Sequence, residues 1–387
     1  MTLALDRRSF LAMAAAGAAS LAAVPRALAQ GAAGKPGPGA APAGWAGYDR
    51  SVVIDALSGL GITSRPRDAA LTAAELSEAK ASGVTAVNLT VSAVGVLQGA
   101  FPQTVDQIGF WDREVNKHPD ALVKVRSAAD IRAAKSSGRF GLIYGFQDTL
   151  MLGDELGRLD TFYELGVRII QLTYNGRNLV GDGCLEPGNA GLSRFGKRLV
   201  ERMNEIGVLV DLSHCGRRTT TEGIEVSKKP VAITHAGCAA VADLPRNKTD
   251  EQLRLLADKG GVFGVYLMPF LRTKGQPMAE DVIRHIDHAV NLCGEDHVGI
   301  GTDGSVSPVA LTPEYIAQFK EEIAQRRKLG ISAPGESEDV YTFVPDLNSA
   351  RRLDTLAAML IGRGYSPERV AKILGGNFAR LFAEAWA

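Results

Sequence analysis

From residue 51 onward, short apolar runs alternate with longer stretches in which apolar positions recur every three or four residues. Short, almost wholly apolar runs are typical of buried parallel strands, and the longer period is typical of amphipathic helices. The predicted strands span residues 51–55, 84–90, 140–146, 167–173, 207–213, 231–235, 262–268 and 298–302. Helices are predicted between them, among others at 73–82, 195–206, 250–259 and 279–292. Eight such repeats predict an α/β protein with a closed (β/α)8 barrel, a TIM barrel.

The alternative architecture is an open, doubly wound parallel sheet, which carries a glycine-rich phosphate-binding turn after its first strand. No G-x-G-x-x-G sequence follows the apolar run at residues 51–55. The closed barrel is therefore favoured.

The predicted strands share a second property, which is a polar residue at or just after the last apolar position. In chain order these residues are Asp55, Asn88, Gln147 with Asp148, Tyr174 with Asn175, His214, His235, Tyr266 and Asp303. A parallel barrel presents its chemistry at the carboxyl ends of its strands. The pattern indicates an enzyme, or a protein descended from one.

The start of the chain has the features of an export signal. Arg7 and Arg8 precede an alanine-rich apolar stretch that ends at Val24, and small residues at 27 and 29 supply a cleavage pattern. We interpret residues 1–29 as a twin-arginine-type signal peptide, which predicts a periplasmic protein. The stretch is shorter than the ~20 residues that a membrane-spanning helix needs, and no later segment qualifies, so no transmembrane span is predicted. Residues 30–46 are predicted to be a flexible leader to a single domain at 47–387.

Composition excludes some partners. The 43 basic residues balance 43 acidic ones, and no lysine or arginine block stands out, so a nucleic-acid partner is not expected. The four cysteines, Cys184, Cys215, Cys238 and Cys293, have spacings that match neither a zinc ribbon nor a C-x-x-C motif. Cys215 and Cys238 are predicted to be small buried residues, with a bridge between them as the alternative.

Several motifs together resemble the membrane (renal) dipeptidase family, peptidase family M19. They are Leu165-Gly-Val-Arg-Ile-Ile-Gln-Leu-Thr-Tyr-Asn175, Val210-Asp-Leu-Ser-His214, Thr234-His235, Pro245-Arg-Asn247 and His297-Val-Gly-Ile-Gly-Thr-Asp303. The similarity extends over most of residues 50–387. The resemblance implies a (β/α)8 barrel of the metal-dependent hydrolase type, whose members typically cleave dipeptides with two zinc ions.

The metal ligands that the resemblance implies are only partly present. His214 and His235 match the histidines that follow the fifth and sixth strands of the family. Leu57 and Gly59 stand where the family has a His-x-Asp pair, and Gln147 stands where it has a bridging glutamate.

Loss of both carboxylates changes the expected metal content. A buried pair of divalent ions without compensating charge costs several kcal/mol per ion. One zinc ion per chain is therefore predicted, held by His214 and His235 with Gln147 as third ligand, and with Asp148 or Asp303 as alternatives for that place. A site with no metal is the other alternative.

The resemblance also implies roles for residues around the ion. Asp303 matches an aspartate that moves a proton between the attacking water and the leaving amine, and Arg246 matches an arginine that holds the substrate's carboxylate. Tyr174 replaces a substrate-contacting histidine and offers a phenol as hydrogen-bond donor. Asp148 is a second candidate acid or base, and Asn175 is a predicted substrate contact.

Three functions follow from these residues. The first is hydrolysis of a dipeptide or a related small amide that bears a free carboxylate. The second is a lyase or isomerase reaction that uses Asp303, His214 and Tyr174 as acids and bases. The third is a catalytically silent periplasmic binding protein. Residues 305–350 are predicted to form an excursion after the eighth strand that could cover the site. Family members often dimerise, and a homodimer stays open.

Overall fold

The computed structural model describes residues 44–61, 69–95, 98–328, 330 and 332–387. The predicted signal peptide and residues 30–43 of the predicted leader lie outside the described residues. From Gly44 onward the described residues belong to one compact unit.

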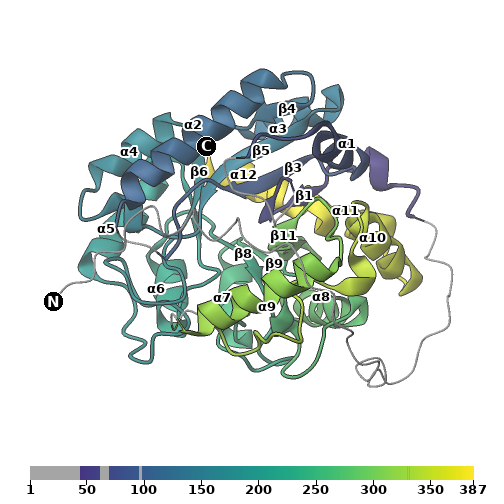
Figure 1. The fold of residues 1–387 in the computed structure, drawn as a ribbon. Helices are drawn as coiled ribbons and strands as arrows, with labels where there is room; N and C mark the ends of the chain where they lie inside the picture. Colours follow the sequence, from purple (N-terminus) through teal and green to yellow (C-terminus); the bar gives the residue numbers. More distant parts are fainter. Residues whose placement is uncertain (1–43, 62–68, 96–97, 329, 331) are drawn as a thin grey trace, which may run out of the picture. The chain divides into compact units, whose positions relative to one another are not determined.

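A parallel barrel forms the centre of this unit (Figure 1). Each of its strands pairs with the next, in the order β1 (Ile54–Asp55), β3 (Ala86–Thr90), β5 (Phe140–Phe146), β6 (Val167–Gln171), β7 (Leu209–Asp211), β8 (Ala232–Ala236), β9 (Val262–Val265) and β10 (Val298–Ile300). The Ala56 amide donates to the Ile300 carbonyl at 2.9 Å, which joins the last strand to the first. The predicted barrel is confirmed. Seven of its strands fall within the predicted apolar runs, and β8 extends one residue beyond its run, to Ala236.

Helices follow the strands around the barrel. They are α1 (Ala73–Ala81), α2 (Ala100–Lys117), α3 (Ala128–Ser137), α4 (Gly157–Glu164), α5 (Arg194–Ile206), α6 (Arg217–Val226), α7 (Asp250–Asp258), α8 (Ala279–Cys293), α9 (Pro313–Lys328), α10 (Arg352–Gly362), α11 (Pro367–Ala371) and α12 (Asn377–Ala385). Local sequence fixes several ends. Thr72 and Thr249 cap α1 and α7 through reciprocal side-chain and backbone hydrogen bonds. Gly207 ends α5 in the left-handed conformation, which favours glycine.

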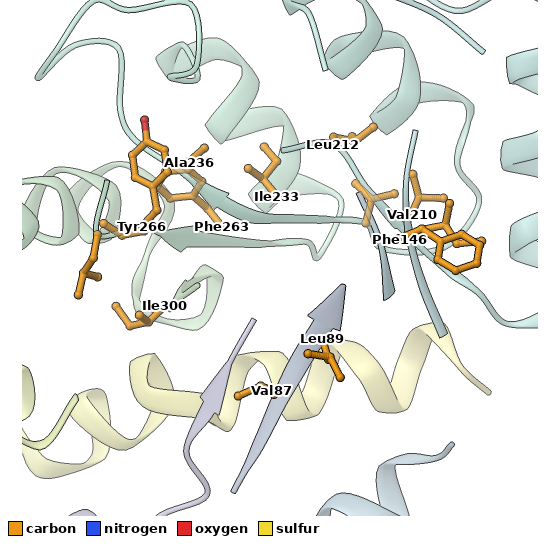
Figure 2. Close-up of a cluster of buried hydrophobic side chains, with 14 of the residues drawn as sticks. Val87, Leu89, Phe146, Val210, Leu212, Ile233, Ala236, Phe263, Tyr266 and Ile300 are labelled. Carbon is orange, nitrogen blue, oxygen red and sulfur yellow. The ribbon is translucent and has the colours of Figure 1, made fainter. Parts of the chain in front are cut away.

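Two apolar clusters lie on opposite faces of the strands. The larger includes Val87, Val210, Ile233 and Phe263 (Figure 2). Their chain neighbours belong to the smaller cluster, which gathers Ile54, Ala86, Ile143, Ile169, Leu209, Ala232 and Val262 from seven barrel strands. Successive strand residues point to opposite faces, so the smaller cluster fills the barrel interior. Phe378, Leu381 and Phe382 of α12 pack into it, and the end of the chain thereby closes one end of the barrel.

Three short strands were not predicted. β4 (Leu122–Lys124) pairs with the edge of β5, and β2 (Ser58–Gly59) pairs in parallel with β11 (Gly304–Ser305). Two or three residues that include glycine or lysine give no apolar run to recognise. The β2–β11 pair ties the segment after β1 to the segment after β10, directly beside Asp303.

The remaining fold predictions concern cysteines and membranes. All four cysteines are free, and Cys215 and Cys238 are buried, so the alternative of a bridge between them is wrong. Among the described residues, no helix has the length and apolar character needed to cross a bilayer.

Candidate active site

Three strand ends bring their side chains to one point at the mouth of the barrel. His214 follows β7, His235 lies in β8, and Asp303 follows β10. One potential ligand atom from each of the three lies within 4.8 Å of the others. The imidazole centroids of the two histidines are 5.0 Å apart. The strand-end pattern thus corresponds to a real cluster of two imidazoles and one carboxylate.

Hydrogen bonds fix the tautomer of His235. The Thr234 hydroxyl donates to Asp211 at 2.6 Å, so its oxygen accepts from Nδ1 of His235 at 2.8 Å. Nε2 of His235 therefore carries a lone pair, and this buried atom has no hydrogen-bond partner. Burial lowers the pKa of His235 well below its usual value, so the ring is neutral. A neutral imidazole with an unused lone pair is a ready metal ligand.

His214 has a different environment. Its Nδ1 lies 2.7 Å from Oδ1 of Asn175, an acceptor, so Nδ1 carries the hydrogen. Its Nε2 lone pair then accepts a hydrogen bond from the Arg246 guanidinium at 3.0 Å. The ring of Tyr174 stacks on the imidazole with centroids 4.3 Å apart. Asn175 thus orients His214, and its predicted substrate contact stays a prediction.

Asp303 is held in an unusual backbone conformation. Its φ of 59° lies in the left-handed region, and its amide donates to the Leu57 carbonyl at 2.8 Å. Burial raises the pKa of Asp303 to about 7, with Asp55 adding to the rise and the charges of Arg246 and Arg326 opposing it. The carboxyl group is therefore close to half-protonated near neutrality.

Two buried aspartates anchor the strand ends beneath the site. Asp55, at the end of β1, accepts from the Thr302 amide at 2.7 Å and the Thr302 hydroxyl at 2.6 Å. Asp211, at the end of β7, does the same for Thr234 and also accepts from Ser213. Each aspartate thus fastens the residue that directly precedes a member of the cluster.

The raised pKa of Asp303 predicts a pH-dependent stability. The folded chain keeps the Asp303 proton up to about pH 7, whereas the unfolded chain loses it near its ordinary value of 3.8. This group's contribution is therefore fully present below about pH 4 and is lost as the pH rises to about 7. In chelated, metal-free protein, the unfolding free energy of wild type relative to Asp303→Asn should fall over that interval. Urea titrations at several pH values measure the difference, and a constant difference would contradict the prediction.

A cavity of about 490 Å³ adjoins the cluster at Asp303, whereas His214 and His235 are not among the residues that line it. From the barrel mouth it is lined by Leu57, Gly59, Gln147, Tyr174 and Asp303. From the excursion after β10 it is lined by Tyr315, Phe319, Arg326, Glu336 and Phe343, among others. Residues 305–350, which include α9 (green in Figure 1), therefore form much of its wall. Coverage of the site by this excursion stays a prediction.

The structure does not bring every predicted residue to the cavity. Arg246 is buried behind His214, donates to the Ser213 carbonyl at 2.8 Å, and is not among the lining residues. Asp148 is also buried, and its carboxylate accepts from Thr149 and Asn178 within its own region of loops. The carboxylate-clamp role of Arg246 and the acid–base role of Asp148 stay predictions.

Two cavity residues were missed by the sequence analysis. Arg326 and Glu336 form an ion pair with two hydrogen bonds, of 2.8 and 2.9 Å. Arg326 lies in the run Gln325-Arg-Arg-Lys328, which looks like a solvated helix surface, and no motif distinguishes it from Arg327. Only the path of the excursion over the barrel places it at the site.

Residues 49–326 match the family model for membrane dipeptidases, peptidase family M19. The chain belongs to family M19. An amidohydrolase of known structure from Pseudomonas aeruginosa is 34% identical, with a TM-score of 0.74 over 88% of this chain and 98% of its own. The dipeptidase verJ of Clonostachys rogersoniana is 33% identical over 59% of this chain and 60% of the relative. The dipeptidase aclJ of Aspergillus oryzae is 33% identical over 75% of this chain and 63% of the relative. The chain thus spans about 60% of the length of these curated relatives.

Family M19 is metal-dependent, and the cluster of His214, His235 and Asp303 is a candidate metal site. The unpartnered Nε2 of buried His235 fits one ion, because a bound cation would satisfy it. A second ion does not fit this M19 chain. Leu57 and Gly59 offer no ligand atoms, and the Gln147 amide carries no charge and donates to Thr90 at 2.8 Å.

Proposed function

We propose that this M19 chain hydrolyses a small amide that bears a free carboxylate, with a dipeptide as the reference substrate, and that it uses one zinc ion. The convergence of two neutral imidazoles and one carboxylate within 4.8 Å, with the His235 lone pair unused, carries the proposal. Two nitrogen ligands and one oxygen ligand are typical of a catalytic zinc site. The names of the curated relatives support amide hydrolysis as the reaction class.

His214, His235 and Asp303 would hold the ion in this proposal. When bound, zinc polarises a carbonyl group and lowers the pKa of a coordinated water. Binding also requires the Arg246 guanidinium to leave Nε2 of His214, where it now donates at 3.0 Å. Arg246 would then be free to turn toward a substrate.

The protein's own groups account for the proton transfers. Water adds to the amide carbon, the carbon–nitrogen bond breaks, and the proton lost by water must reach the leaving amine. A carboxylate at Asp303 can accept that proton and return it to the leaving nitrogen. Burial raises the pKa of Tyr174, so its phenol stays protonated and can donate to the oxygen that gains negative charge.

Metal content tests the proposal directly. We expect about one zinc per chain after purification without chelator or after reconstitution. His235→Ala should lose most of it, because the unpartnered ligand is removed. His288→Ala is the matched control, since His288 lies on α8 and pairs with Asp250 instead. Elemental analysis of the three proteins decides the matter, and wild-type chain that binds no zinc would overturn the proposal.

Turnover completes this test. Zinc-loaded wild type should release free amino acids from part of a dipeptide library, with no product when the carboxylate is amidated. Zinc-loaded protein that cleaves neither dipeptides nor N-acyl amino acids would rule out hydrolysis.

One observation favours a metal-free alternative. The Arg246 guanidinium already occupies the Nε2 lone pair of His214 and supplies a positive charge beside Asp303. In that case the cavity would serve a lyase or isomerase reaction, or would bind a carboxylate without chemistry. Ligand binding that persists in a chain free of zinc, together with an inactive dipeptide library, would favour this alternative.

A further inference from the structure

The cavity wall that the excursion after β10 forms carries a second polar centre. Nε and Nη2 of Arg326 donate to the two carboxylate oxygens of Glu336. The Glu336 side chain is only 6% exposed, and the Arg326 side chain is 23% exposed. Ser332 also donates to Glu336, at 3.2 Å. Glu336 is therefore a buried and fixed partner, while its arginine reaches the cavity.

The guanidinium of Arg326 has donors left after this pairing. A guanidinium has five N–H groups; the two-point contact with Glu336 uses two of them, and a hydrogen bond to the Tyr174 phenol engages a third. Its charge also opposes the burial-driven rise in the pKa of both Tyr174 and Asp303, which shows that it faces the reacting end of the cavity. A small anion in the cavity would meet these free donors.

The other arginines near the cavity, Arg352 and Arg246, already form hydrogen bonds within the protein. Arg352 lines the cavity but donates to the backbone carbonyls of Ser349, Ser305, Val306 and Ser307. Arg246 is buried and bonded to Ser213 and His214. Among the described residues that line the cavity, Arg326 is therefore the arginine with N–H groups to offer.

An aromatic row stands beside Arg326 on the same wall. Tyr315 and Phe319 stack with centroids 6.2 Å apart, Phe319 lies 5.6 Å from Tyr341, and Tyr341 stacks on Phe343 at 5.2 Å. Tyr315, Phe319 and Phe343 line the cavity. Rings with exposed faces in a cavity provide apolar area and stacking surfaces for a ligand.

We propose that Arg326, held by Glu336, is the carboxylate-binding residue of this cavity, and that the ligand is a small carboxylate with a bulky apolar or aromatic group that packs on the aromatic row. The inference rests on the proposed function for the presence of a carboxylate, and it adds the residue that binds it and the shape of the side group. Glu336 lies beyond residue 326, where the match to the family model ends.

Binding measurements test this inference. The probes are N-acetylphenylalanine, its carboxamide, and N-acetylglycine, each titrated calorimetrically into the full chain. Wild type should bind the phenylalanine acid at least ~10-fold more tightly than either of the other two, because each lacks one recognised group. Arg326→Met should weaken the binding of N-acetylphenylalanine by about 10- to 100-fold and should leave the affinity for the carboxamide little changed. Arg327→Met is the matched control, since Arg327 is the next residue of α9 and its side chain is 59% exposed.

The positioning role of Glu336 has its own variant. Glu336→Gln keeps the shape and loses the charge, so it should weaken acid binding less than Arg326→Met and should not affect the carboxamide. Loss of acid preference in Arg246→Met with full preference in Arg326→Met would overturn the proposal. Absence of acid binding by wild type would also overturn it.

These titrations need no turnover, so they separate the two proposals. If the chain shows no hydrolytic activity but binds N-acetylphenylalanine more tightly than its carboxamide, and Arg326→Met removes that preference, this inference stands and the proposed function is wrong. If the chain hydrolyses amides and Arg326→Met still prefers the acid to the carboxamide, the proposed function stands and this inference is wrong.

Discussion

Asp303→Asn is expected to lower kcat by about 10³-fold for any amide that the chain cleaves, which is the usual range for loss of a general acid and base. The carboxamide keeps the size of the side chain and tolerates the left-handed backbone at this position. It cannot accept and return a proton, so the step fails while the cavity keeps its shape. Steady-state kinetics and calorimetric binding of N-acetylphenylalanine, with zinc content measured in parallel, check the result.

Ligand affinity in this variant should stay within about three-fold of wild type, since Arg326 carries the carboxylate contact in our proposal. Asp243→Asn is the control, because the Asp243 side chain is 80% exposed and outside the cavity. Unchanged turnover in Asp303→Asn would exclude the proton-transfer role. A loss of turnover that follows the loss of zinc would trace the effect to the metal-binding role of Asp303 and leave the proton-transfer role unsupported.

Asp211→Ala should lower the free energy of unfolding by about 3–5 kcal/mol, which is the usual effect of removing one side of a buried network that involves a charge. Asp211 accepts hydrogen bonds from the backbone amide and hydroxyl of both Ser213 and Thr234, at 2.5 to 3.1 Å. Alanine leaves these donors buried without partners. Urea denaturation at neutral pH measures the change.

The same variant should also disturb the metal site. Without Asp211, the Thr234 hydroxyl no longer has to accept from Nδ1 of His235, so the tautomer is no longer fixed and zinc affinity should fall. Asp160→Ala is the control for stability, since its ion pair with Arg202 is half exposed and contributes ~1 kcal/mol or less. A loss below ~1 kcal/mol in Asp211→Ala would contradict the network's importance.

Most of the barrel could be predicted from sequence because its strands are buried on both faces. Segments such as 140–146 and 231–235 are nearly continuous apolar runs, and each contains or overlaps a strand of the structure. β2 and β11 were missed because their pairing joins two-residue segments about 245 positions apart and leaves no local periodicity.

Some residues of the candidate site could be predicted from the sequence, and others could not. His214, His235 and Asp303 could be placed together because parallel strands all end at one mouth of the barrel. The depth of Arg246 could not be predicted, since its buried position depends on hydrogen bonds to the distant residues Ser213 and His214. Arg326 was missed because a charged helix in a long excursion gives no signal of which face meets the barrel.

The backbone at position 303 adds a second cost to that of the buried carboxyl group. A left-handed φ of 59° suits glycine, which adopts it without steric cost, better than it suits aspartate. Burial also disfavours the charged form of this side chain, as its raised pKa indicates. Local strain of this kind is concentrated at functional sites, so the conformation of Asp303 agrees with the role that we propose for it.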